Sequence, residues 1–390
     1  MVVILLGVGA TFLGRSEGMY SEARTIGQGI ATFQELEERF EMLSETKGAV
    51  YGYEVLRRAV LPPNTDFHLL GHTVGNLLYI QKGVGGIADC TPEFRNACSH
   101  AVVIGAFNEF GGEAALDLIR DACRSSPGGP GAYTMCYHGL GHGVFAFYDY
   151  SLPETVALCE KTGTDAFQNR EATECIGGAV MELTGGGGHN PELWHVSRTR
   201  YLISPLAPCT SDVIPGDAKR ECLMYLTPEI WKSVGIDLAQ PDPELFGKAF
   251  ATCDTLTDTS LRRACFGGFG KEFVPLVIAR DVRNIATFAE KESALVSEWC
   301  AQARVLDGVT ACVEQALQSL FWGGENDPEI SFRFCQEIHT GQRAACFSEL
   351  GDAIASYVRE GNRRVELCNR LPKQNSLSCL QNKIWQDNTL

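Results

Sequence analysis

The cysteines constrain the fold of this chain more than any other feature. Its sixteen cysteines fall into eight successive pairs, whose members are 8 to 16 positions apart, and successive second cysteines are 33 to 47 positions apart. A period of this length is typical of stacked structural repeats. An even number of regularly spaced cysteines also indicates a compartment where disulfides persist, which places the chain outside the cytoplasm. The predicted disulfides are Cys90–Cys98, Cys123–Cys136, Cys159–Cys175, Cys209–Cys222, Cys253–Cys265, Cys300–Cys312, Cys335–Cys346 and Cys368–Cys379. Spacing alone leaves other pairings open.

The segments around the cysteines have the periodicity of helices. After Cys312 the apolar residues Val313, Ala316, Leu317 and Leu320 recur at steps of three and four, which is the amphipathic helical period. Between such segments, motifs of the kind Asn190-Pro191-Glu192 place a capping residue, a proline and a carboxylate where a helix begins. The sequence therefore predicts an all-α, solenoid-like array of two-helix repeats joined by disulfides.

The two ends of the chain differ in composition. Residues 2–13 (VVILLGVGATFL) form an apolar run of the length found in export signals, although no Lys or Arg precedes it and no clear cleavage motif follows. We divide the chain into a signal or membrane-anchor segment (1–16), a linker or N-terminal helix (17–45) and the disulfide-stapled helical repeat domain (46–390). A buried N-terminal helix is the alternative for the first segment.

Charge and motif content exclude several classes of function. The formal net charge is −15 and no basic stripe is present, so nucleic acid is not an expected partner. No C-x-x-C occurs, which argues against a thioredoxin-like redox motif. Membrane contact is expected only through the N-terminal segment, because no later run of about 18 apolar residues is present.

Five of the eight histidines lie between residues 68 and 142. His68-Leu69-Leu70-Gly71-His72 and His138-Gly139-Leu140-Gly141-His142 share the pattern H-x-x-G-H, and His100 follows Cys98 by two residues, as His138 follows Cys136. Residues four apart share one face of a helix, and stacked repeats superpose equivalent positions. We therefore expect one histidine-lined site, formed by His68, His72, His100, His138 and His142.

Imidazole ligands indicate the chemistry of such a site. Neutral imidazole suits zinc, copper or iron, and Asp66, Glu109 and Glu182 are candidate neighbouring carboxylates. A zinc-protease motif is excluded, because Leu69 and Gly139 stand where H-E-x-x-H requires glutamate. Glycines beside the histidines permit a close approach of helices or of a ligand.

Other interpretations of the histidines stay open. A duplicated repeat copies its histidines without needing them, so the five residues also fit a purely structural, buried role. His189 and His195 flank a glycine run and are expected to face solvent, and His339 is expected at the surface.

The combination of H-x-x-G-H with Cys136-Tyr137-His138-Gly139 and paired cysteines resembles a set of uncharacterised exported, cysteine-rich helical proteins of bacteria and archaea. The similarity covers residues 66–182, and it implies no particular activity. Later repeats replace the histidine by Gly177, Met224, Gly267, Glu314, Ser348 and Gln381, so any site is expected in the N-terminal third. The general plan is also similar to that of Sel1-like and tetratricopeptide arrays, in architecture alone.

The expected function follows from the histidines and the compartment. We expect an exported protein, secreted, periplasmic or anchored, that binds a transition metal, with oxidase or hydrolase activity if a coordination position stays open. The alternative is a metal-free scaffold that binds a protein or peptide on a concave face. An enzyme using the histidines without an ion is a third possibility, but the sequence offers no nucleophile for it.

Overall fold

The fold is known from a computed structural model, which describes residues 18–62, 65–91, 93–126, 129–186, 190–278, 285, 287–323, 328–358 and 361–381. Helices and short 3-10 turns make up the regular structure of these residues, with no strand among them, so the predicted all-α class is confirmed. The expected signal or anchor segment (1–16) lies outside the described residues. Within the described residues, no helix has both the length and the apolar character that a membrane crossing requires.

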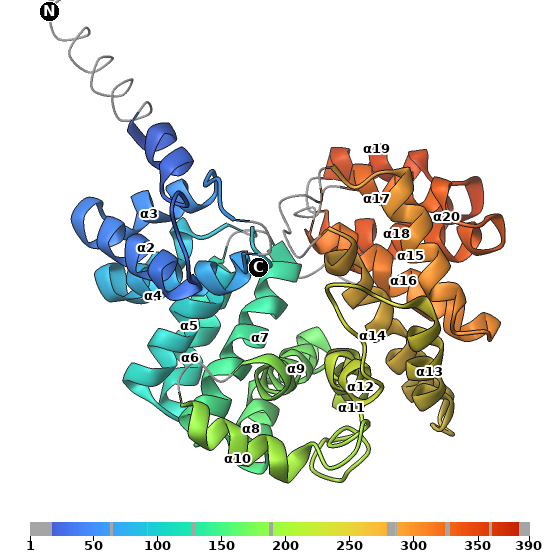
Figure 1. Ribbon diagram of the computed structural model, residues 1–390, viewed down its shortest axis with the longest axis horizontal. Coiled ribbons are helices and arrows are strands. Elements are labelled where there is room, and N and C mark those ends of the chain that lie inside the picture. Colours follow the sequence, from blue (N-terminus) through green and yellow to red (C-terminus); the bar gives the residue numbers. More distant parts are fainter. Residues whose placement is uncertain are drawn as a thin grey trace, which may run out of the picture.

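One set of helices carries the second cysteine of every pair, and together with α4 it runs through the molecule in chain order (Figure 1). These helices are α4 (Phe67–Lys82), α5 (Ala97–Phe110), α7 (Gly129–Phe147), α9 (Arg170–Gly185), α11 (Ala218–Tyr225), α14 (Thr259–Val277), α16 (Leu306–Gly323), α18 (Arg343–Tyr357) and α20 (Lys373–Gln381). Each contacts the next member of the set. Histidine-bearing α4, α5 and α7 are therefore direct neighbours.

A second set of helices alternates with the first along the chain. It comprises α2 (Phe33–Lys47), α3 (Ala49–Leu56), α6 (Leu116–Ser125), α8 (Leu152–Cys159), α10 (Pro191–Tyr201), α12 (Thr227–Ser233), α13 (Pro243–Asp254), α15 (Glu290–Ala301), α17 (Pro328–Glu337) and α19 (Gly361–Arg370). Six of them carry a first cysteine near their C-terminal end, whereas Cys90 follows the 3-10 helix η1 (Gly83–Asp89) and Cys209 lies in an irregular segment after α10.

The helix starts follow the sequence motifs that predict them. Helices α10 and α13 begin at Pro191 and Pro243, whose missing N–H groups a first turn does not need. The side chain of Asn190 accepts a hydrogen bond from the N–H of Leu193 (3.1 Å), and Asp242 accepts one from the N–H of Glu244 (2.9 Å). These caps satisfy N–H groups that have no partner within the helix.

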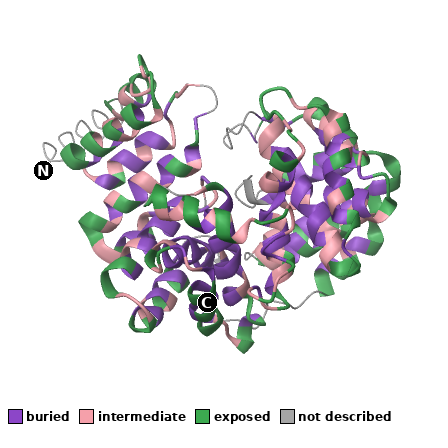
Figure 2. Ribbon diagram, turned by 60° about the horizontal axis from the view of Figure 1, so that its bottom comes forward, coloured by how far each residue is buried: buried purple, intermediate pink, exposed green. Residues whose placement is uncertain are grey.

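The disulfides join the eight pairs that the spacing predicts, with Cα–Cα distances of 5.5 to 5.6 Å. Each bond ties a first-cysteine segment to the helix that follows it. The cysteines are buried within one continuous hydrophobic core that extends from Ala23 to Cys379 (Figure 2). Eight such bonds indicate folding in an oxidising environment.

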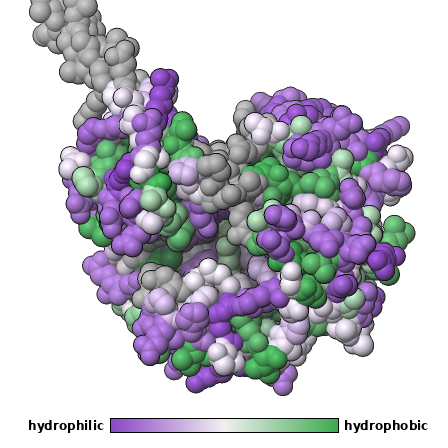
Figure 3. Space-filling view, in the orientation of Figure 1, coloured by the Kyte–Doolittle hydropathy of each residue, from purple (hydrophilic) through white to green (hydrophobic). Residues whose placement is uncertain are grey.

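The path of the helices is curved, and distant repeats meet. Helix α18 contacts α7, and the guanidinium of Arg95 donates a hydrogen bond to Ser319 Oγ on α16 (3.0 Å), 224 residues away. An open linear array would keep these repeats apart, so the predicted solenoid-like arrangement is not confirmed. Figure 3 shows the face of the molecule hollowed between the early helices and the late ones.

Candidate metal centre

The first pair of histidines lies on α4. Asp66 caps this helix by accepting a hydrogen bond from the N–H of Leu69 (2.9 Å), and His68 and His72 follow one turn apart. Their Nε2 atoms are 3.1 Å apart. Two nitrogens bound to one tetrahedral ion at 2.0–2.1 Å would be roughly 3.3 Å apart, so this spacing is already that of a chelating pair.

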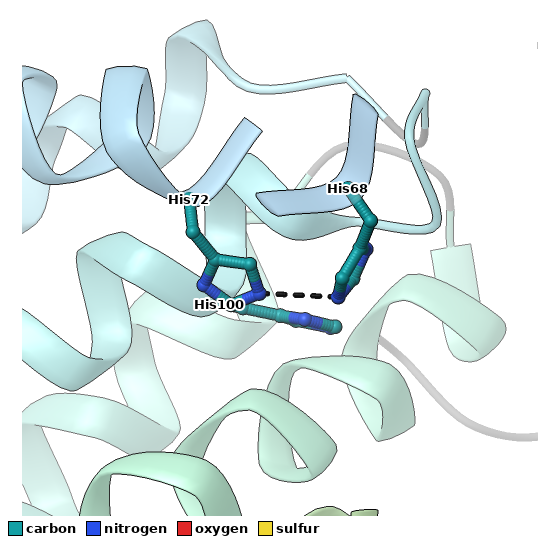
Figure 4. A group of neighbouring side chains, drawn as sticks. All are labelled: His68, His72 and His100. Atoms are coloured by element: carbon teal, nitrogen blue, oxygen red, sulfur yellow. Dashed lines mark hydrogen bonds between the residues drawn. The ribbon is translucent and has the colours of Figure 1, made fainter. Parts of the chain in front are cut away.

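His100 on α5 completes a group of three. One ring nitrogen from each of His68, His72 and His100 lies within 4.8 Å of the other two, and the rings converge from two neighbouring helices (Figure 4). His68 Nδ1 lies 2.7 Å from the carbonyl oxygen of Phe94, to which a ring N–H donates. That hydrogen bond leaves the lone pair on Nε2, the atom that faces His72.

The second pair lies on α7, on the other side of α5. The ring centroids of His138 and His142 are 5.1 Å apart, and His100 lies 5.7 Å from His138 and 6.2 Å from His142. His72 and His142 are 5.9 Å apart. The structure therefore brings all five sequence-predicted histidines into one cluster, with the expected ladder His68, His100, His138 across adjacent helices.

Helix α9 supplies groups that contact the second pair. Glu182 Oε2 lies 3.0 Å from His142 Nδ1, Met181 Sδ lies 3.4 Å from His138 Nε2, and Glu174 Oε2 lies 4.0 Å from His138 Nδ1. Of the three carboxylates proposed from the sequence, Glu182 lies at hydrogen-bond distance from a histidine. Asp66 caps α4, and Glu109 accepts a hydrogen bond from Tyr79.

Sequence reasoning missed Glu174 and Met181. Glu174 directly precedes Cys175, and Met181 directly precedes Glu182. Neither falls in an H-x-x-G-H motif. Their contacts depend on how α9 crosses α7, so local spacing contains no signal for them.

Burial sets the protonation of the cluster. Removal from water lowers the pKa of His68 to about 4 and holds the pKa values of His100 and His138 well below the usual range. Neighbouring imidazoles lower them further, since a second positive charge nearby is unfavourable. These three rings are therefore neutral at pH 7, which is the form that binds metals.

The motif glycines allow the helices to approach closely. A Cβ on Gly71 would lie 2.7 Å from Ala97 Cβ, and one on Gly139 would lie 2.5 Å from His100 Cα. Real side chains do not tolerate such contacts. The glycines thus bring α4 and α7 against α5, and with them the rings.

Charged groups of later helices border the cluster at His138. The ring of Tyr225 on α11 lies 4.8 Å from the His138 ring, and Lys271 Nζ lies 4.3 Å from the centroid of Tyr225. Burial beside Glu174 raises the pKa of Glu221 to about 8. The interior next to the histidines is therefore polar.

The remaining histidines lie apart from the cluster. His195 on α10 and His339 are exposed, as predicted, and His189 lies outside the described residues.

No known protein family, curated protein or solved structure matches this chain.

Proposed function

We propose that this protein is an exported transition-metal-binding protein whose ion is held by His68, His72 and His100, with His138 and His142 completing the histidine wall. The observation that supports this most directly is the convergence of three ring nitrogens within 4.8 Å, two of them at chelating distance. Three imidazoles suit zinc, copper or iron, and leave a coordination position for water or a substrate.

The different burial of the three rings fits a metal site. His100 is fully buried, whereas His68 and His72 are partly exposed. The partial exposure of His68 and His72 gives an ion a route to the site. The buried ring of His100 shields the inner side of the site from water. A carboxylate or carbonyl that holds the distal N–H of a ligand histidine is typical of metal centres, and Phe94 fills this role for His68.

The disulfides support the proposed location. Eight stable disulfides require an oxidising compartment, and the apolar run at residues 2–13 provides a candidate export or anchoring signal.

Metal analysis of protein purified without a histidine tag tests the proposal. We expect stoichiometric bound metal or, for metal-stripped protein, a rise in thermal stability on adding zinc or copper. At a free metal concentration 100 times Kd the gain is about 2.7 kcal/mol. Replacing His68 and His72 together by alanine should reduce this gain sharply, because it removes the tighter site, whereas His195→Ala with His339→Ala should retain it. Absence of both bound metal and stabilisation would overturn the proposal and favour the metal-free scaffold that binds a protein or peptide.

A further inference from the structure

The two H-x-x-G-H motifs form two similar pairs of rings. The centroids of His68 and His72 are 4.7 Å apart with an interplanar angle of 77°, and those of His138 and His142 are 5.1 Å apart at 69°. Two imidazoles on one tetrahedral ion, each bound at about 2.0 Å, have centroids roughly 5 Å apart. Both pairs therefore have the separation that a shared ion requires.

His100 lies between the pairs with two unused nitrogens. Its centroid is 5.6 and 5.5 Å from His68 and His72 on one side, and 5.7 and 6.2 Å from His138 and His142 on the other. The residue has no exposed surface, and neither Nδ1 nor Nε2 has a hydrogen-bond partner. A neutral imidazole contains one donor and one acceptor, and burying both without partners is unfavourable. Two metal bonds would use both atoms.

The second pair also presents unused lone pairs. The carboxylate of Glu182 accepts the Nδ1–H of His142, which leaves Nε2 as the bare nitrogen, and this buried atom has no partner. Met181 Sδ lies 3.4 Å from Nε2 of His138, and the buried Nδ1 of that ring has no hydrogen-bond partner. Glu174 lies 4.0 Å from this Nδ1 and adds a carboxylate within reach.

We propose that the cluster is a dinuclear centre, with a second transition-metal ion held by His138, His142 and His100, and with His100 bridging the two ions as an imidazolate. This inference rests on the proposed function, because the first ion is the one at His68, His72 and His100. Binding of the second ion displaces the remaining N–H proton of His100, which is released to solvent. The negative imidazolate, together with Glu174 and Glu182, offsets the repulsion between two cations.

The two positions differ in how closely their ligands converge. In the first set, the ring centroid of His100 lies at most 5.6 Å from those of His68 and His72. In the second set, it lies up to 6.2 Å from those of His138 and His142. The second set must contract slightly to bind, so the ions bind in sequence, first at the α4 pair and then, more weakly, at the α7 pair.

A copper titration of tag-free, metal-stripped protein distinguishes the outcomes. We expect two equivalents of Cu(II), the first binding more tightly. The electron paramagnetic resonance signal should grow with the first equivalent and fall with the second, since an imidazolate bridge couples the two unpaired spins antiferromagnetically. One equivalent at saturation, or two with additive signals, would overturn the bridged centre. Zero equivalents would overturn the proposed function itself.

Variants assign the second ion to its residues. Replacing His138 and His142 together by glutamine should leave one equivalent and a full, uncoupled copper signal, while His195→Gln with His339→Gln should retain both ions. Circular dichroism checks the fold of each variant. The wild-type titration decides the matter even if the buried replacements fail to fold. Two coupled ions in a folded His138→Gln/His142→Gln variant would exclude these residues as ligands.

Discussion

Helices α7 and α14 occupy equivalent places in two halves of the molecule and differ in chemistry. In both, the glycine five residues after the second cysteine packs directly on the backbone of the next helix. A Cβ on Gly141 would collide with the carbonyl oxygen of Cys175 and lie 2.9 Å from Ala179 N, and one on Gly270 would collide with that of Cys312 and lie 2.9 Å from Ala316 N. This close helix–helix contact is therefore repeated with nearly the same geometry.

The side chains on these two helices are not repeated. Where α7 has His138 and His142, α14 has Gly267 and Lys271. Lys271 pairs with Glu272 and lies over the ring of Tyr225, so its charge is compensated, whereas His138 Nδ1 and His142 Nε2 are buried without hydrogen-bond partners. Close packing and disulfides therefore build the framework in both places, whereas the buried ring nitrogens without hydrogen-bond partners are a property of α7.

Removing a disulfide should weaken both halves similarly. The Cys123–Cys136 bond closes a loop of 13 residues and the Cys253–Cys265 bond one of 12, so each double replacement by alanine should cost about 3 kcal/mol. Denaturant unfolding measures the loss. Only the change at Cys123 and Cys136 should also lower metal affinity, because it frees the helix that carries His138. Equal loss of affinity in both variants would contradict the separation of framework and site.

Substitution of Gly141 and Gly270 should destabilise the protein in both cases, but only substitution of Gly141 should weaken metal binding. Gly141→Ala and Gly270→Ala each push two helix backbones apart, and each should destabilise the protein by about 2 kcal/mol. Gly216→Ala provides the control, since a Cβ there meets no atom within 4 Å. Metal titration of the folded variants should reveal weaker binding for Gly141→Ala alone. If Gly270→Ala weakens binding as strongly, the site depends on the whole helical framework.

Much of this framework is predictable from the sequence, because its signals are local. Disulfides that close short loops are evident from spacing, and Pro191 and Pro243 mark helix starts through chemistry confined to one turn. The clustering of the five histidines also follows, since His100 and His138 hold the same position in adjacent repeats.

The remainder depends on how repeats rotate relative to one another. The contact of α18 with α7 joins repeats that are far apart in the chain, and no single segment encodes it. The packing of α9 against α7 places Met181 in contact with His138 and Glu182 in contact with His142, and local spacing does not encode this packing either. Sequence spacing identifies the ligands but not the residues that orient them.

Glu182 should matter through the orientation of His142. Glu182→Gln keeps the size of the side chain but removes the negative charge facing His142 Nδ1, and loss of such a partner typically lowers metal affinity 10- to 100-fold. Isothermal titration should show this loss in the second binding step. Glu314→Gln is the matched control in the other half, because Glu314 pairs with Arg263 and lies on α16. A weakened first step with an intact second step would reverse the assignment of Glu182.

Acidification should affect helices α4 and α5 in the opposite direction to helices α16 and α18. Burial lowers the pKa of His68 to about 4, from 6.5 in the unfolded chain, so the unfolded state binds more protons between these values and the metal-free site loses stability as pH falls from 6.5 to 4. Burial raises the pKa values of Glu314 and Glu349, so their contribution is fully present below pH 4.5 and is lost as pH rises.

Amide hydrogen exchange measures both trends in one sample of metal-free protein. After correction for intrinsic rates, protection of α4 and α5 should fall by on the order of 1 kcal/mol between pH 6.5 and 4, while that of α16 and α18 should stay level or rise. Zinc at saturation should delay the loss in α4 and α5 to lower pH, since protons must then displace the ion. A uniform decline in all four helices would mean that the neutral imidazoles are not the groups that distinguish the two halves.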